Sequence, residues 1–492
     1  MKTPELLAPA GSISMLETAL AFGATAIYAG QPRYSLRVRN NDFGDIEVLK
    51  RGIDTVHAKG AKFFLVSNIF PHGNKIRHYI DNMAPVIALK PDAMIMSDPG
   101  LIMMVREKWP EMEIHLSVQS NTVNSAAVKF WQKVGLKRII LSRELSLDQV
   151  EEIRQACPDM ELEVFVHGAL CIAYSGRCLL SGYFNHRDAN QGSCTNSCRW
   201  DYKTQKGVVD ASGDVLTEQA ADEREQGAIA RSPDADQVYM IEESQREGSY
   251  MPIEEDEHGT YVMNSKDLRA IEHVKRLVDI GVDSLKIEGR TKSPYYVART
   301  VQTYRRAIDD AVAGRELDPA LLGQLEGLAN RGYTSGFFQR HTPQDTQNYL
   351  RGYSESGRSL YVGDALEFDP ARGLMKVNVR NRFAVGDWLE IIHPAGNSDV
   401  LLTAMENVDA KAISVAPGSG HTVWLALPET AVGAFVARYV NAPETRAPQQ
   451  SQQPVGEGEG EGEGQGEVRG EHQQQYQGAG EVQSLPTESS GL

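Results

Sequence analysis

The stretch 138–167, RIILSRELSLDQVEEIRQACPDMELEVFVH, contains the structural unit that repeats along the first part of the chain. Apolar runs at 138–142 and 162–167 flank a segment of helical character that begins at Ser146. Ser146 and Gln149 fit a capping box, in which each side chain bonds the backbone N–H of the other residue. We therefore predict a strand–helix–strand unit of the kind that builds parallel sheets.

Similar apolar runs recur through the first 290 residues, and helical segments such as 14–22 and 76–89 separate most neighbours. Ser14 with Glu17 fits a second capping box, and we expect Asn264 to cap the helix before the last strand. Eight strands that alternate with helices predict an α/β fold, and the number eight favours a TIM-like (β/α)8 barrel over an open sheet. The six remaining runs are 6–10, 26–30, 63–68, 93–97, 114–119 and 284–288.

The barrel is expected to occupy residues 1–350 and to carry one long insertion, at about 168–258. Within the insertion we expect an ordered cysteine-bearing part that ends near residue 205, followed by a mobile acidic part. Two helices, around 294–314 and 318–330, are predicted to follow the last barrel strand.

Residues 356–440 alternate short strands with turns at Asp369-Pro370 and Pro417-Gly418. This pattern predicts a small all-β barrel domain of six or seven strands. Residues 443–492 consist mainly of Gly, Glu and Gln and contain few apolar side chains. Because such a segment cannot bury enough apolar surface to fold, we predict a disordered C-terminal tail.

The net charge of −16 is concentrated in two segments. Residues 207–257 hold 15 acidic and 3 basic side chains, and residues 441–492 hold 9 acidic and 2 basic ones. Removing these local charges of −12 and −7 leaves the rest of the chain at +3. The predicted folded parts are therefore compatible with a polyanionic partner, although their charge does not demand one.

No stretch of the sequence approaches the roughly 18 apolar residues that a membrane span requires. The N-terminus, MKTPELLAPAGS, lacks the apolar core of a secretory signal. We therefore expect a cytoplasmic protein without a membrane partner. Disulfides are rare in the cytoplasm, so clustered cysteines there indicate a metal or redox site.

Four cysteines, Cys171, Cys178, Cys194 and Cys198, fall within 28 residues rich in Gly, Ser and Asn. Four thiolates on segments that can curl around one centre suit zinc or an iron–sulfur cluster. Zinc sites usually contain two tight C-x2-C pairs, which are absent here, so the spacing favours the cluster and leaves zinc as the alternative. The fifth cysteine, Cys157, lies at a predicted helix end and is interpreted as a structural thiol.

Polar side chains alternate with apolar ones in three of the predicted strands, although barrel interiors are normally apolar. We interpret these polar faces as one pocket at the C-terminal ends of the strands, where barrel enzymes carry their chemistry. An internal salt bridge or a solvated edge is the alternative for each strand taken alone. The polar positions are His115, Ser117 and Gln119 in the fifth strand, Glu163 and His167 beside Phe165 in the seventh, and Ser284, Lys286 and Glu288 in the eighth.

Basic residues at this predicted mouth are candidates for binding a carboxylate substrate. Arg290, Lys286 and Arg143 follow or end strands, and an arginine binds a carboxylate through two parallel hydrogen bonds. His167 lies four residues before Cys171 and is expected between the pocket and the metal, either as a proton shuttle or as a support for the loop. We take His167, Lys286, Glu288 and Arg290 as the catalytic candidates.

The common hydrolase motifs, G-x-S-x-G and H-E-x-x-H, and the P-loop are absent from the sequence. Residues 163–181, EVFVHGALCIAYSGRCLLS, instead resemble the conserved segment of the peptidase U32 family. Four further segments also resemble family motifs, and together the five cover most of residues 1–440. They are PELLAPAGS (4–12), YVMNSKDL (261–268), DSLKIEGR (283–290) and NRGYTSGFF (330–338).

The resemblance implies more than the family name suggests. Several members carry a 4Fe-4S cluster on four cysteines, which here would be the four clustered ones, and hydroxylate ubiquinone precursors, ribosomal RNA or tRNA without oxygen. A barrel followed by one β domain is most similar to the tRNA-acting members. These use prephenate to hydroxylate C5 of the wobble uridine, and the resemblance leaves room for an electron-transfer partner. A U32-type peptidase, an rRNA or ubiquinone-precursor hydroxylase and a non-catalytic tRNA-delivering scaffold remain the alternatives.

Overall fold

The computed structural model describes residues 2–36, 41–170, 266–328, 332–339 and 359–440, together with the backbone of six short strands between Gly207 and Thr260. Eight parallel strands form a closed barrel, because β15 pairs with β1 on one side and with β7 on the other. The barrel strands are β1 (Glu5–Pro9), β2 (Ala26–Gly30), β3 (Lys62–Ser67), β4 (Ala93–Met96), β5 (Ile114–Leu116), β6 (Arg138–Ile140), β7 (Glu161–Ala169) and β15 (Ser284–Ile287).

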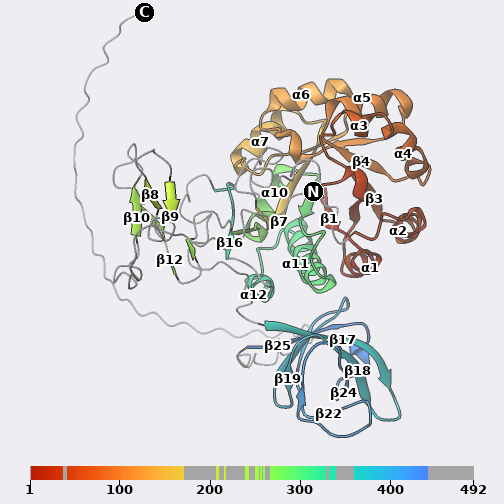
Figure 1. The fold of residues 1–492 in the computed structure, drawn as a ribbon, viewed down its shortest axis with the longest axis vertical. Coiled ribbons are helices and arrows are strands. Elements are labelled where there is room, and N and C mark those ends of the chain that lie inside the picture. The colour runs from red at the N-terminus through yellow and green to blue at the C-terminus, as the bar shows by residue number, and fades with distance from the viewer. Residues whose placement is uncertain are drawn as a thin grey trace, which may run out of the picture. The chain divides into compact units, whose positions relative to one another are not determined.

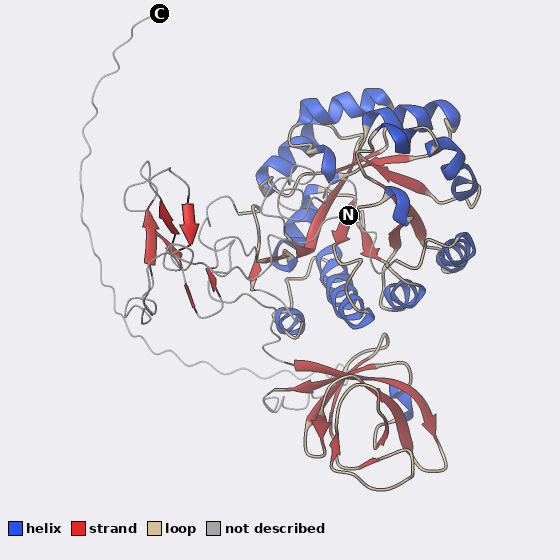
Figure 2. Ribbon diagram, in the orientation of Figure 1, coloured by secondary structure: helices blue, strands red, loops and turns tan. Residues whose placement is uncertain are grey.

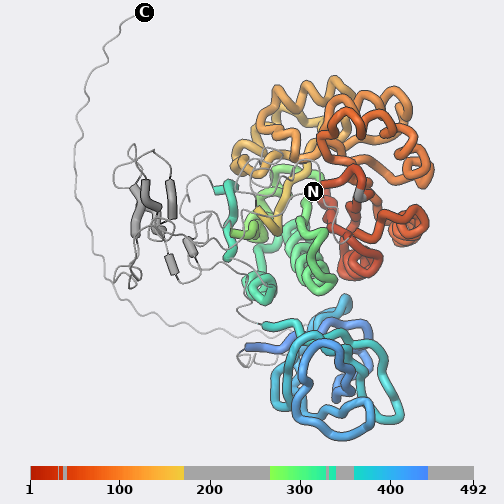
Figure 3. The backbone as a smooth tube through the Cα atoms, viewed as in Figure 1, coloured from red at the N-terminus to blue at the C-terminus, as the bar shows by residue number. Residues whose placement is uncertain are grey.

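Helices surround this barrel on the outside (Figures 1 and 2). The predicted TIM-like barrel is thus confirmed, and its first and last strands lie side by side although almost the whole barrel sequence separates them (Figure 3). The helices between and after the barrel strands are α1 (Ile13–Ala21), α2 (Ile46–Ala58), α3 (Gly73–Ile76), α4 (Tyr79–Ile87), α5 (Pro99–Lys108), α6 (Ser125–Val134), α7 (Leu147–Ala156), α10 (Val274–Ile280), α11 (Pro294–Val312) and α12 (Ala320–Glu326).

The helix starts confirm one predicted cap and correct others. Ser146 and Gln149 form the expected capping box at α7. At α1 the cap is Ser12, whose side chain accepts from the backbone of Met15, so the prediction of Ser14 was wrong by two residues. A serine two positions earlier satisfies the free N–H groups equally well.

Two predicted helices differ from those of the structure. Helix α10 starts at Val274 after the short 3-10 turn Ile271–His273, ten residues beyond the expected cap Asn264, which itself lies outside the described residues. The segment predicted as one helix at 76–89 is split between α3 and α4.

The segment between β7 and β15 adds further strands. Strand β14 (Asp267–Arg269) pairs antiparallel with β7, and β16 (Tyr333–Thr334), which follows α12 in the chain, pairs with β14. Between Gly207 and Thr260, the described residues form three antiparallel strand pairs: β8 (Gly207–Val209) with β9 (Val215–Thr217), β10 (Tyr239–Glu242) with β11 (Tyr250–Ile253), and β12 (Glu255–Asp256) with β13 (Gly259–Thr260).

The C-terminal β domain is an antiparallel sheet of seven strands in the order β21-β20-β25-β17-β18-β24-β22, curved around its own apolar core (Figure 2). The turns at Asp369-Pro370 and Pro417-Gly418 lie between strands as predicted. The strands are β17 (Ser359–Asp369), β18 (Leu374–Val379), β20 (Trp388–Ile392), β21 (Ser398–Leu401), β22 (Met405–Glu406), β24 (Thr422–Leu425) and β25 (Phe435–Tyr439), with β19 (Phe383–Ala384) and β23 (Val415–Ala416) as a separate pair.

Helix α11 joins the two folded parts. It is buried along most of its length, and Arg299 donates to Glu390 of the β domain at 2.8 Å. Tyr295 stacks on Tyr361, with ring centroids 4.5 Å apart. None of the helices in the described ranges has the length and apolar composition needed to cross a membrane. The predicted tail at 443–492 lies outside the described residues.

Candidate active site

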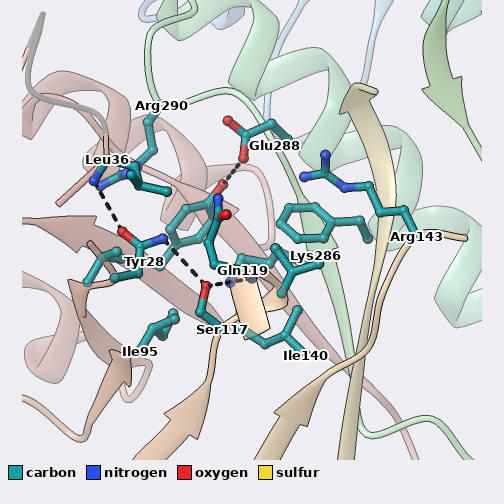
Figure 4. A pocket seen from close by; sticks show the side chains of 14 residues that line it. Tyr28, Leu36, Ile95, Ser117, Gln119, Ile140, Arg143, Lys286, Glu288 and Arg290 are labelled. Atoms are coloured by element: carbon teal, nitrogen blue, oxygen red, sulfur yellow. Dashed lines mark hydrogen bonds between the residues drawn. The ribbon is translucent and has the colours of Figure 1, made fainter. Parts of the chain in front are cut away.

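A pocket lined by both polar and apolar side chains lies at the C-terminal ends of the barrel strands (Figure 4). Its lining comes from six of the eight barrel strands and from the loops that follow them. Lys286, Glu288, Arg290 and Arg143, four of the residues singled out from the sequence, line this pocket together. Its place in the barrel agrees with the general rule for barrel enzymes.

Lys286 reaches the pocket from strand β15 and is held by a buried carboxylate. Its Nζ donates to Glu163 of β7 at 2.9 Å, and both residues are at most 3% exposed. Glu163 also accepts from Arg138 at 3.1 Å, and Arg138 binds Glu5 at 2.6 Å. Charged groups therefore form a continuous network from the pocket to the N-terminal ends of the strands.

Burial and charge act in opposite directions within this network. Burial lowers the pKa of Lys286, although the neighbouring Glu163 opposes the shift. Burial alone would raise the pKa of Glu163, but the positive charges of Lys286 and Arg138 outweigh it and lower that pKa. Glu163 therefore stays ionised, and Lys286 gives up its proton more easily than an exposed lysine does.

Two aromatic rings enclose the ammonium group of Lys286. Its Nζ lies 4.4 Å from the ring centroid of Tyr28 and 5.4 Å from that of Phe165. Each ring also meets a guanidinium group, because Arg290 lies 5.8 Å from Tyr28 and Arg143 lies 4.0 Å from Phe165. The pocket thus combines three cationic groups with apolar faces, which suits an anion that carries a ring.

The loop after β15 positions the remaining acidic and basic groups. Arg290 donates to Ser35 at 2.8 Å, and the hydroxyl of Tyr28 donates to the carbonyl of Ile287 at 2.8 Å. The same hydroxyl lies 3.4 Å from Oε2 of Glu288. These bonds fix the loop at the rim of the pocket.

The turn after β5 contributes two of the polar residues that the sequence predicted for the fifth strand. Ser117 and Gln119 line the pocket, whereas His115 lies deeper, with its ring centroid 4.7 Å from that of Phe64. Burial lowers the pKa of His115, so the ring is held neutral. The strand itself ends at Leu116, earlier than expected, because Ser117 starts a 3-10 turn.

His167 does not line the pocket, and the expectation that it shares a face with Glu163 and Phe165 was wrong. The pairing of β7 with β15 shifts between Lys286 and Ile287, so the alternation of side chains breaks there. His167 instead packs against the rings of Tyr296, Tyr304 and Tyr333, with centroids 5.9, 5.5 and 5.6 Å away. Burial lowers its pKa to about 3. Its catalytic role stays a prediction.

The four clustered cysteines, Cys171, Cys178, Cys194 and Cys198, lie outside the described residues. Strand β7, which precedes them in the chain, ends at Ala169, at the same end of the barrel as the pocket. As a donor set, four thiols fit an iron–sulfur cluster. Cys157, by contrast, is buried at the end of α7 and donates to the carbonyl of Ser125 at 3.7 Å, as a structural thiol does.

Three residues of the site were not found from the sequence. Tyr28 lies in the middle of an apolar run, Arg138 starts one, and Asn68 ends one, so none of them breaks the apolar pattern in a recognisable way. Asn68 accepts from the backbone of Leu36 at 3.2 Å and thereby ties two pocket loops together. Only barrel closure brings these side chains to one site.

Models of known families match nearly all of the folded sequence. Residues 11–348 match the model of peptidase family U32, and residues 358–438 match that of the peptidase family U32 C-terminal domain. The chain belongs to peptidase family U32. In this U32 protein the pocket lies within the first matched region, and the β domain corresponds to the second.

Curated relatives of this U32 chain have names that refer to RNA hydroxylation. It is 58% identical over 433 residues to tRNA hydroxylation protein P of Escherichia coli K12, covering 87% of this chain and 95% of that protein. The protein of the same name from Haemophilus influenzae is 53% identical, with 87% and 94% covered. The 23S rRNA 5-hydroxycytidine C2501 synthase of Escherichia coli is 28% identical, with 74% and 47% covered.

Proposed function

We propose that this chain is an iron–sulfur tRNA hydroxylase that adds a hydroxyl group to C5 of the wobble uridine, using prephenate and no dioxygen. The observation that carries the proposal is the near end-to-end match, at 58% identity, to a protein named for tRNA hydroxylation. Similarity that extends over both the barrel and the β domain supports the same substrate class for both proteins.

The pocket is suited to prephenate, a cyclic dicarboxylate. Arg290 and Arg143 supply guanidinium groups for the carboxylates, and Lys286 supplies a third positive charge. The rings of Tyr28 and Phe165 offer flat apolar faces to the ring of the ligand. The chain's own residues thus bind and orient the co-substrate and exclude water from around it.

In this proposal Cys171, Cys178, Cys194 and Cys198 hold a 4Fe-4S cluster beside the pocket mouth. The cluster would supply electron transfer, which amino-acid side chains alone do not provide. Replacing the C5–H of uracil by C–OH with an oxygen at the oxidation level of water removes two electrons from the ring, and we propose that an electron-transfer partner accepts them. We propose that Lys286 and Glu288 handle protons at the pocket.

We propose that the β domain contacts the tRNA. Trp424 lies partly exposed on β24, with the guanidinium of Arg372 4.7 Å and Nζ of Lys376 5.9 Å from its ring centroid. An aromatic ring beside basic groups is a common surface for unpaired bases and phosphates. The arginine and the lysine also pair with Glu406 and Glu367, so their charge is partly compensated.

Complementation of cells that lack the chain tests the proposal. We expect the wild type to restore hydroxyuridine derivatives in tRNA, measured by nucleoside mass spectrometry, and to purify without oxygen as a brown protein with about four irons. Cys194→Ala should lose both the iron and the modification. Cys157→Ala is the matched control and should keep both. Modification by iron-free Cys194→Ala protein would contradict a role for the cluster.

A further inference from the structure

A lysine buried inside a barrel and exposed only to a pocket is a potential covalent catalyst. Lys286 is 3% exposed and lines the pocket from the third position of β15. Among the described residues, its Nζ has one hydrogen-bond acceptor, Glu163 at 2.9 Å, and two aromatic faces. A lysine amine desolvated in this way becomes a nucleophile toward carbonyl groups.

We infer that Lys286 forms an imine with the carbonyl carbon of a 2-oxo acid bound in the pocket. The inference rests on the proposed function for its ligand, because prephenate carries a 2-oxo acid side chain. It goes beyond the proposed function because it assigns Lys286 a covalent bond to the co-substrate, in addition to an ion pair.

The placement of the cations favours this geometry. The guanidinium groups of Arg290 and Arg143 each share an aromatic ring with Lys286, Arg290 through Tyr28 and Arg143 through Phe165. They therefore flank the ammonium (Figure 4). A carboxylate bound by either arginine places the adjacent carbonyl carbon toward Nζ, as an attack on that carbon requires.

The ion pair with Glu163 is compatible with the reaction. Nζ forms a C–N bond to the carbonyl carbon, and the carbonyl oxygen leaves as water. Overall an ammonium and a ketone give a protonated imine and water, so the positive charge beside Glu163 is unchanged. Glu163 accepts a proton from the ammonium to free its lone pair and returns a proton to the departing hydroxyl group.

Glu163 remains paired with a positive charge while the amine of Lys286 is neutral. Arg138 lies 3.1 Å from the same carboxylate, so the buried negative charge is compensated throughout. Burial, which lowers the pKa of Lys286, adds to the supply of the neutral amine. No oxidant or reductant takes part in this step.

Reductive trapping tests the inference directly. The full-length protein, purified without oxygen, is incubated with prephenate or with pyruvate and sodium cyanoborohydride, which reduces imines to stable amines. We expect a mass increase equal to the acid less one oxygen atom, located on the peptide that contains Lys286. Acetone, which has a carbonyl but no carboxylate, should give no adduct at that residue.

Two lysine variants provide the controls. Lys286→Arg should lose the adduct, and Lys133→Arg, at an exposed position of α6, should form it as the wild type does. The adduct is located on Lys286 in the wild-type protein, so a folding defect of Lys286→Arg would not change the conclusion. Wild-type protein with adducts only at exposed lysines, or with none, would overturn the inference.

Failure of the inference is distinguishable from failure of the proposed function. If trapping gives no adduct at Lys286 while the wild type still restores hydroxyuridine in tRNA, the imine is wrong and the hydroxylase stands. If the adduct forms but cells lacking the chain have unchanged tRNA, the imine stands and the proposed substrate is wrong.

Discussion

The ammonium of Lys286 lies 2.9 Å from a carboxylate oxygen of Glu163, on the neighbouring barrel strand β7. The second oxygen of this carboxylate is 3.1 Å from Arg138, which also binds Glu5 and Glu161. The pocket is therefore not an isolated polar site in an apolar barrel. Its central cation belongs to a network that also holds the strands together.

Removing Arg138 should destabilise the protein more than removing Lys286. Arg138→Met leaves three carboxylates without their shared cation and should lower the free energy of unfolding by about 3–5 kcal/mol. Lys286→Met should cost less, because Arg138 still compensates Glu163. Urea denaturation at neutral pH measures both. Lys50→Met, in an exposed pair with Asp54, should leave the midpoint unchanged, and equal losses for the two buried variants would contradict the network.

Arg290→Ala should raise the prephenate concentration needed for half-maximal tRNA hydroxylation by about 10- to 100-fold, the range expected for one lost charge-assisted hydrogen bond. Nucleoside mass spectrometry of tRNA incubated in extracts with added prephenate gives this value. Arg315→Ala, at an exposed site where the side chain pairs with Asp310, is the control. A lower maximal level of tRNA hydroxylation, at an unchanged half-maximal prephenate concentration, would show that Arg290 binds the RNA instead.

Gly168→Ala should abolish most of the hydroxylation activity. Gly168 has a φ of +104°, and a Cβ there would lie 2.5 Å from the carbonyl oxygen of Glu288. The loop that carries Glu288 and Arg290 must then move. Gly60→Ala, with a φ of +69° and open space around it, should lose only about 1–2 kcal/mol of stability and keep its activity. Equal activity in the two variants would show that the loop position is unimportant.

The buried His167 should make stability fall at acidic pH. Its pKa is lowered from the ordinary value of 6.5 to about 3 by burial, so below pH 6.5 the unfolded chain binds a proton that the folded chain does not. The stabilisation is complete above pH 6.5 and falls by up to about 1.4 kcal/mol per pH unit toward pH 3. Denaturation across this range should show a shallower slope for His167→Gln. Identical slopes for the two proteins would contradict the assignment.

The barrel could be predicted because each strand and each helix has its own local pattern. The eight apolar runs correspond to the eight barrel strands, and Ser146 with Gln149 caps the helix that was expected there. The exact ends of the strands and helices were less predictable, since they depend on which polar side chain forms a hydrogen bond with the backbone. At Ser117 the side chain accepts from the backbone of Gln119 and ends the strand early.

The pocket was only partly predictable, for a physical reason. The alternation in β15 identified Lys286 and Glu288 correctly as pocket residues. The same reasoning failed for His167 in β7. An irregular strand pairing depends on both strands and cannot be recognised in the sequence of one strand alone. The bond between Lys286 and Glu163 joins residues 123 positions apart, and only closure of the barrel brings them together.

Analysis of tRNA from cells that lack this chain and grow without oxygen is the decisive test of wobble-uridine hydroxylation by this protein. Without oxygen, no oxygen-dependent hydroxylase can replace the missing protein. We predict that hydroxyuridine derivatives at the wobble position disappear in these cells, and that the wild-type gene restores them while Cys194→Ala does not. Unchanged levels of these nucleosides in the deletion strain would contradict it.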